Sequence, residues 1–450
     1  MKKVCNGSKY LFLFLFCFIA CTFTYSIITS DAIWNFGFSY AIARGEVPYV
    51  DFNMVVPPFS PFVYLIPFLF SNSYIVYLLF QSVLFVILFY FLEKLFGNKV
   101  YLLLILLVFP LPSFLIPIIF PGYNFLLILL FTLLLYLEKK KCNDYIIGIL
   151  LGLCIFTKQS VGVFFVLPSL YYLFKDRKKF LKRLLGIFGV CLVFLGYFLL
   201  SGSFFDFLNC CVLGMFDFQN KNQSNFFTNF YFWLWFSLIL VLIYFLIKKD
   251  NKMFTGYLLS FSTISYPLFD HYHVGLFLFV FCYFIFSRVP FSKRWLTGFC
   301  FSFSFIIYFM LMMVCHHFEI PYIASFPNFE MIKISEETEK NILLLSNYLN
   351  QNKGKNIIFL TNDAYFFKII HNLDITYYDL LNYGNHGYHG TERLLQNIEN
   401  EDDAYFVLSS DEYQNISSDN QFNMDVVNYV INNYPLVEKE GDYEIYQKVS

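Results

Sequence analysis

Side chains that could do chemistry are rare in this sequence, and most of them stand beside apolar segments. Charged residues make up 14% of the 450 residues, against about 25% in soluble domains. Carboxylates can accept protons, and an ammonium group can bind an anion, so clustered charges in such a chain could form a catalytic or anion-binding site. The candidates are two carboxylates in the stretch SDAIWNFGFSYAIARGEVPYVDFN, a lysine with its neighbouring amide, and an aspartate–histidine pair: Asp31, Asp51, Lys158, Gln159, Asp270 and His273.

Each candidate also has an ordinary structural interpretation. A charge at the centre of a bilayer costs roughly 2.5–3.5 kcal/mol, so charges normally lie at helix ends, where they need no function. Asp51, in PYVDFN, fits a turn or helix cap better than a catalytic position. His273 could simply be hydrogen-bonded to Asp270. The argument for a functional site rests on the candidates taken together, because all of them are predicted below to lie on one side of the membrane.

Metal binding has weak support in the sequence. His386 and His389 lie in GNHGYHG, but its three glycines favour a tight loop, and no third ligand stands nearby. Asp31 and Asp51 could hold a divalent cation, although two carboxylates alone make a weak case. We therefore expect no metal site and no certain cofactor, with a divalent cation left open.

The composition is that of a polytopic membrane protein. Hydrophobic residues make up 58% of the chain, and 63 residues are Phe. The eleven cysteines lie mostly in apolar segments, without a CxxC pair, so we interpret them as small hydrophobic residues. The net charge of −1 and the lack of a basic patch argue against nucleic acid as a partner.

Apolar segments long enough to cross the bilayer recur along the chain. A spanning helix needs about 20 apolar residues. Eleven candidates are residues 10–28, 74–92, 100–117, 121–137, 144–157, 160–174, 183–201, 226–247, 254–269, 274–287 and 295–314. Segment 58–70 has three prolines and reaches only about 20 Å as a helix, so we expect it to be interfacial or re-entrant.

The distribution of Lys and Arg between the loops predicts the orientation of the chain. With eleven spans, one set of loops holds 20 Lys and Arg residues, and the opposite set holds three. Cytoplasmic loops carry the excess of positive charge. We therefore expect a cytoplasmic N-terminus, an extracytoplasmic C-terminus and an outer first loop at residues 30–73, in a multi-pass protein of the plasma membrane.

The character of the sequence changes near residue 316. Residues 1–315 form the predicted transmembrane domain, and 316–450 a small extracytoplasmic α/β domain. Ser335, followed by two glutamates, is a typical helix N-cap. Three segments are expected to be strands: NIIFL (356–360), AYFVL (404–408) and YEIYQ (443–447).

Four segments resemble parts of the GT-C superfamily of polytopic glycosyltransferases, which includes bacterial aminoarabinose transferases and protein O-mannosyltransferases. The first is SDAIWNFGFSYAIARGEVPYVDFNMVVPPFSPF, which is similar to their first outer loop. The others are FTKQSVG (156–162), YPLFDHYH (266–273) and DLLNYGNHGYHG (379–390). One position departs from the pattern: many members have two adjacent acids after the first helix, whereas here Asp31 is followed by Ala32.

The resemblance implies inverting transfer of a hexose or pentose from a polyprenyl-phosphate carrier to a cell-envelope glycan, lipid or protein. Asp31 would be the general base, and Asp51 a possible second acid. The resemblance assigns donor or phosphate binding to Lys158, Gln159, Arg44, Asp270 and His273.

Three other functions are compatible with a polytopic chain of this kind. A flippase or transporter of lipid-linked sugars commonly has internal repeats and mid-membrane charges, and neither is visible here. A polysaccharide polymerase is expected to carry its large outer segment in mid-chain. A non-catalytic GT-C relative remains compatible with the missing second acid.

Overall fold

The computed structural model describes residues 4–23, 31–104, 119–221, 228–248, 251–288, 322–414 and 422–448. Most of the predicted span 100–117 and the whole of 295–314 lie outside these residues.

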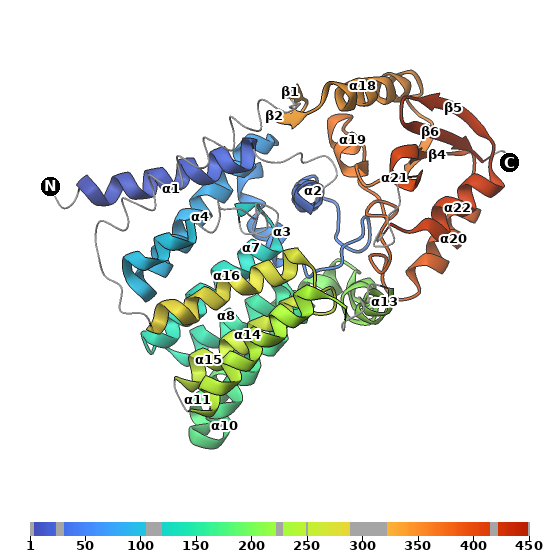
Figure 1. Ribbon diagram of the computed structural model, residues 1–450. Coiled ribbons are helices and arrows are strands. Elements are labelled where there is room, and N and C mark those ends of the chain that lie inside the picture. The colour runs from blue at the N-terminus through green and yellow to red at the C-terminus, as the bar shows by residue number, and fades with distance from the viewer. Residues whose placement is uncertain are drawn as a thin grey trace.

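Long apolar helices make up the first two thirds of the described chain (Figure 1). The longer ones are α1 (Val4–Phe23), α4 (Tyr74–Phe96), α7 (Tyr123–Lys139), α8 (Asp144–Thr157), α11 (Arg177–Leu200), α14 (Phe230–Ile247), α15 (Lys252–Phe261) and α16 (His271–Arg288). Four described helical segments are long and apolar enough to cross a membrane by length and composition: Tyr74–Leu104, Arg177–Leu200, Phe230–Ile247 and His271–Arg288. The structure therefore supports a helical membrane protein, while the count of eleven spans stays a prediction.

Short helical pieces connect the long helices. They are α3 (Phe59–Val63), η1 (Ile66–Leu69), η2 (Gly97–Tyr101), α9 (Gln159–Gly162), η3 (Val163–Ser169), α10 (Leu170–Lys175), α12 (Phe204–Phe207), η4 (Leu208–Leu213), α13 (Gly214–Lys221) and η5 (Ser262–Ser265). Segment 58–70 is split into α3 and η1, as expected for a proline-rich stretch. Its interfacial position stays a prediction.

Helices α8 and α11 pack closely because glycines face the partner backbone. A Cβ atom added to Gly148 of α8 would lie 2.1 Å from the carbonyl oxygen of Arg183, and one added to Gly186 of α11 would lie 2.5 Å from that of Tyr145. Both distances are far below ordinary van der Waals contact. Small residues at helix interfaces allow such approach in membrane proteins.

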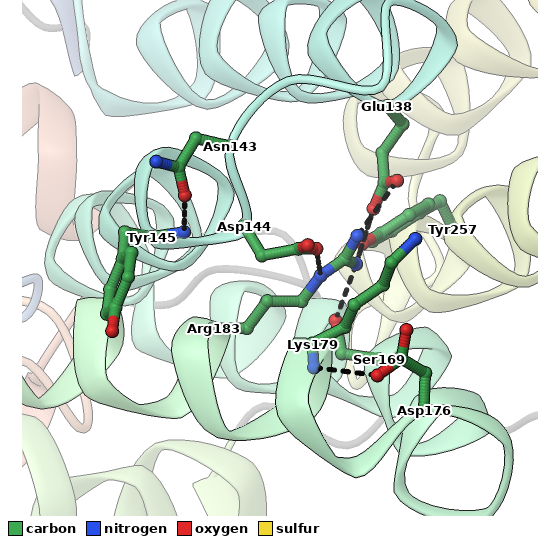
Figure 2. A network of polar contacts seen from close by, with 9 residues as sticks. All are labelled: Glu138, Asn143, Asp144, Tyr145, Ser169, Asp176, Lys179, Arg183 and Tyr257. Carbon is green, nitrogen blue, oxygen red and sulfur yellow. Dashed lines mark hydrogen bonds and ion pairs between the residues drawn. The ribbon is translucent and has the colours of Figure 1, made fainter.

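A buried arginine links several helices near the same crossing (Figure 2). The Arg183 guanidinium forms ion pairs with Glu138 at 2.5 Å and with Asp144 at 2.8 Å. It also donates hydrogen bonds to Ser169 Oγ and Tyr257 Oη. The guanidinium thus reaches α7, α8, η3 and α15 from α11, and its buried charge is paired with two carboxylates.

Residues 322–448 form the α/β part, coloured orange to red in Figure 1. Its elements are β1 (Tyr322–Phe326), β2 (Phe329–Ile334), α18 (Glu336–Gln351), β3 (Asn356–Phe359), α19 (Ala364–Ile370), α20 (Gly390–Asn400), β4 (Ala404–Ser409), α21 (Ser410–Gln414), α22 (Met424–Asn433), β5 (Leu436–Glu440) and β6 (Tyr443–Gln447). β1 and β2 form a hairpin, and the other strands form a sheet of order β3-β4-β6-β5. β3 is parallel to β4, and the remaining pairs are antiparallel.

The three predicted strands are confirmed as β3, β4 and β6, and Ser335 caps α18 by accepting from the backbone N–H of Thr338. The hairpin strands β1 and β2 and the strand β5 were not predicted. β5 is largely exposed and carries the charged residues Glu438, Lys439 and Glu440, so it lacks the apolar pattern of a buried strand.

Helix α2 (Asp31–Ala43) joins the helical part to the α/β part (Figure 1). Trp34 Nε1 donates a hydrogen bond of 3.2 Å to the carbonyl oxygen of Asn362. Gly37 packs so closely on the ring of Tyr365 that an added Cβ would lie 2.1 Å from it. The N-terminal half of α2 is therefore held against α19 and the loop before it.

Candidate functional site

A cavity of about 590 Å³ lies where the helical part meets the α/β part. Its walls come from the N-terminal half of α2, the junction of α8 and α9, α13, the segment before α16, and the loop before α20. The last of these walls includes Leu380, Asn382, Gly384 and Asn385. The cavity is therefore built from segments that are far apart in the sequence.

Five of the seven predicted site residues line this cavity. They are Asp31, Lys158, Gln159, Asp270 and His273. Asp31 is the first residue of α2, where the partial positive charge of the helix N-terminus favours a carboxylate. Lys158 and Gln159 stand at the break between α8 and α9. Asp270 and His273 stand at the start of α16.

A chain of hydrogen bonds connects the buried lysine to the carboxyl group of Asp31. Lys158 Nζ donates to Asn124 Oδ1 at 2.9 Å, and Asn124 Nδ2 donates to Tyr272 Oη at 3.0 Å. Tyr272 in turn forms a side-chain hydrogen bond with Asp31. Since Asn124 uses its oxygen for the lysine and its nitrogen for the tyrosine, Tyr272 is left to donate its own proton to Asp31. The chain thus orients both charged groups.

The second carboxyl group is closely paired with its histidine. His273 Nδ1 lies 2.9 Å from both carboxylate oxygens of Asp270, and the His273 backbone N–H donates to Asp270 Oδ1 at 2.7 Å. Although burial opposes ionisation, the charge and hydrogen bonds of His273 lower the pKa of Asp270 to about 2. Asp270 is therefore ionised at neutral pH and is a poor proton acceptor.

The Asp31 carboxyl group is the more basic of the two. Burial raises the pKa of Asp31 above its ordinary value, and the charge of Asp270 adds to this rise, while His273, Lys158 and the hydrogen bond from Tyr272 oppose it. A raised pKa makes a carboxylate a better general base, provided that it stays ionised at the working pH.

Lys158 is buried, with a side chain 9% exposed. Burial lowers the pKa of Lys158 to about 8, although Asp31 and Asp270 oppose the shift. Its Nζ also lies 5.1 Å from the centre of the Tyr123 ring. Lys158 therefore carries most of its charge at neutral pH and can present it to an anion in the cavity.

Arg44 and Asp51 are not among the residues that line the cavity. Arg44 forms an ion pair with Asp374 at 2.8 Å and donates to Asn372 at 2.7 Å, at an exposed position beyond the end of α2. The Asp51 carboxylate accepts from the backbone N–H of Val47 at 2.6 Å. These placements fit structural roles, so neither residue belongs to the proposed site.

The two histidines of the GNHGYHG loop lie in different environments. His386 is buried, whereas His389 is exposed and its backbone N–H donates to Asp217 at 2.5 Å. Within the described ranges, no group of three or more His, Cys, Asp and Glu side chains could hold a metal ion.

Asn124 and Tyr272 were missed in the sequence. Asn124 is the first polar residue of a helix that is otherwise apolar for several turns, and such a residue is a candidate for buried hydrogen bonding. Tyr272 lies between Asp270 and His273 in the predicted motif, but in this chain rich in tyrosine its type alone gave no signal.

A family model matches the central part of the chain. Residues 55–259 match the model for glycosyltransferase family 87. This part of the chain, with the helical fold described above, is therefore similar to a family of glycosyltransferases.

Solved structures agree at the level of the fold. ArnT from Cupriavidus metallidurans bound to undecaprenyl phosphate has a TM-score of 0.55 at 12% identity, over 98% of this chain and 97% of that chain. ArnT from the same organism in the apo state has a TM-score of 0.53 at 11% identity, over 99% and 98%. No curated protein sequence matches this chain. The predicted resemblance to the GT-C superfamily is thus confirmed.

Proposed function

We propose that this protein transfers a sugar from a polyprenyl-phosphate carrier to an extracytoplasmic acceptor with inversion at the anomeric carbon. The observation that carries the proposal is the Lys158–Asn124–Tyr272–Asp31 chain at the cavity wall, which holds a cation and a basic carboxylate in one site. Undecaprenyl phosphate is bound in the similarly folded ArnT, which supports a lipid phosphate as the ligand here.

The reaction needs one base and one site for the leaving phosphate. A hydroxyl group of the acceptor attacks C1 of the sugar, the C1–O bond to the carrier phosphate breaks, and the hydroxyl proton passes to Asp31. Polyprenyl phosphate leaves as an anion without needing a proton, so a single carboxylate suffices. The alanine that follows Asp31 is therefore compatible with catalysis.

Lys158 stabilises the negative charge on the departing phosphate. A buried ammonium is more effective there than in water, because the surrounding dielectric constant is lower. Asn124 fixes the ammonium position, and Tyr272 fixes the Asp31 carboxylate. Asp270 holds His273 at the cavity wall, where the imidazole can contact the donor headgroup.

The proposed topology places this cavity at the outer surface of the membrane. Eleven spans with a cytoplasmic N-terminus put the junction of α8 and α9, the start of α16 and the whole α/β part (316–450) outside. The acceptor is then a glycan, lipid or protein of the cell envelope, and the sugar a hexose or pentose.

Incubation of the purified protein in lipid nanodiscs with undecaprenyl-phosphate sugars tests the proposal. Release of undecaprenyl phosphate, dependent on an added membrane extract as the acceptor source, is the expected result. Movement of intact donor across the bilayer of proteoliposomes, without release of the carrier, would instead identify a flippase.

A further inference from the structure

Gln159, next to the cavity lysine, has a side-chain amide whose orientation is fixed by two backbone carbonyl groups. Its Nε2 donates to the carbonyl oxygens of Val55 and Cys211, each at 3.0 Å. A carboxamide nitrogen has two hydrogens, so both are used. The opposite orientation would place Oε1 against two carbonyl oxygens, where it could form no hydrogen bond. The carbonyl end of Gln159 is therefore held in one direction.

The fixed Oε1 atom is buried and has no hydrogen-bond partner among the described residues, while Gln159 itself lines the cavity. Buried polar atoms in folded proteins almost always have a partner, so an unpaired acceptor at a cavity wall points to a ligand that donates to it. A hydroxyl group is such a donor. A phosphate diester has only acceptor oxygens and is repelled by Oε1.

Lys158 and Gln159 are thus adjacent residues with opposite preferences. The ammonium of Lys158 suits the carrier phosphate, and the carbonyl of Gln159 suits a hydroxyl group. In a polyprenyl-phosphate sugar, the phosphate is bonded directly to the anomeric carbon, so these two chemical groups are neighbours. Both side chains line the same cavity, so one donor molecule could contact both of them.

We propose that Gln159 recognises the sugar of the glycosyl donor and not its phosphate. Its Oε1 atom accepts a hydrogen bond from a hydroxyl group of that sugar. The inference rests on the proposed function, and it makes Gln159 a specificity-determining residue. The lining of the same cavity includes the further carboxamide residues Asn382 and Asn385. Carboxamides can both donate hydrogen bonds to sugar hydroxyl groups and accept them.

Binding measurements without acceptor test the inference. Undecaprenyl phosphate and undecaprenyl-phosphate glucose, mannose and galactose are titrated into nanodisc-embedded wild type, Gln159→Leu and Lys158→Ala. Loss of one hydrogen bond corresponds to roughly 3- to 10-fold in affinity. We expect Gln159→Leu to weaken the best-bound sugar donor by about this factor and to leave bare undecaprenyl phosphate within twofold of wild type. Lys158→Ala should weaken all ligands alike.

A deoxy donor gives a second, independent measurement. Donors that lack single hydroxyl groups are titrated into wild type and Gln159→Leu. One deoxy donor should bind to wild type more weakly than the complete donor does. To the variant, the same deoxy donor and the complete donor should bind with equal affinity, because the hydroxyl and Oε1 form one interaction. If Gln159→Leu lowered the affinity for bare carrier and for sugar-loaded carrier equally, or lowered neither, the inference would be overturned. Wild type that binds bare carrier but shows no preference for any sugar would also overturn it. Wild type that binds none of the ligands would overturn the proposed function itself.

Discussion

Asp31 and Asp51 stand in the same segment between α1 and α4, yet their carboxylates have different surroundings. Asp31 lines the cavity and is hydrogen-bonded by Tyr272, whereas Asp51 accepts from the backbone of Val47 in a turn. If Asp31 is the general base, Asp31→Asn should lower turnover by roughly 10²–10⁴ and leave donor affinity nearly unchanged. Single-turnover release of undecaprenyl phosphate measures this effect.

The matched control is Asp51→Asn, which makes the same chemical change in the same loop. We expect its turnover to stay within a few-fold of wild type. Near-normal turnover in Asp31→Asn combined with a large loss in Asp51→Asn would reverse the assignment of the base.

The two charged groups of the cavity should give the reaction a bell-shaped pH profile. Asp31 acts as a base only when ionised, so activity rises as the pH passes through its raised pKa. Lys158 stabilises phosphate only when protonated, so kcat/KM falls as the pH rises above about 8, the pKa to which burial lowers this lysine. Lys158→Arg keeps its charge above pH 10, because the guanidinium pKa exceeds about 12.

Comparison of the pH profiles of wild type and Lys158→Arg measures this effect. The alkaline limb should move to higher pH in the variant, even if its overall activity is lower. An alkaline limb at the same pH in both proteins would assign that limb to another group.

At the level of elements, the contact between α8 and α11 depends on glycine. Gly148→Ala would bring Cβ to 2.1 Å from the Arg183 carbonyl oxygen, so the helices must separate and strain the Arg183 ion pairs. We expect a loss of about 1–3 kcal/mol in the free energy of unfolding. Thermal unfolding in detergent, followed by tryptophan fluorescence, measures the change.

Gly189 on α11 provides the control, because an added Cβ there would meet no atom within 4 Å. Gly189→Ala should be neutral or stabilising by roughly 0.5–1 kcal/mol, as alanine favours a helix over glycine. Equal destabilisation by both substitutions would show that helix contact is not the cause.

The sequence predicted elements well where one local pattern determined them. Ser335 with two following acids marked a helix start, and short segments rich in aromatic and aliphatic residues marked β4 and β6. The sequence did not predict contacts between elements that are far apart along the chain. The pairing of Asn124 with Tyr272, and the separation of Arg44 from the cavity by its pairing with Asp374, depend on how helices and loops meet in space.

At the scale of the whole molecule, the 20 to three distribution of Lys and Arg between the two sets of loops predicts the orientation in the membrane. Reporter fusions after Asn143 and after Asp250 should show a cytoplasmic position, and a fusion after Ser203 an external one. A cytoplasmic signal at Ser203 would require a different number of spans before α12.

The composition of the cavity walls has a consequence for biosynthesis. Asp31 is made early, whereas Asn385 of the opposite wall follows about 350 residues later. At roughly 5–20 residues per second, the ribosome needs about 20–70 s between the two. During that interval the cavity wall that contains Leu380, Asn382, Gly384 and Asn385 has not yet been synthesised. We therefore expect a complete cavity to form only after the last third of the chain has been synthesised and has folded against α2.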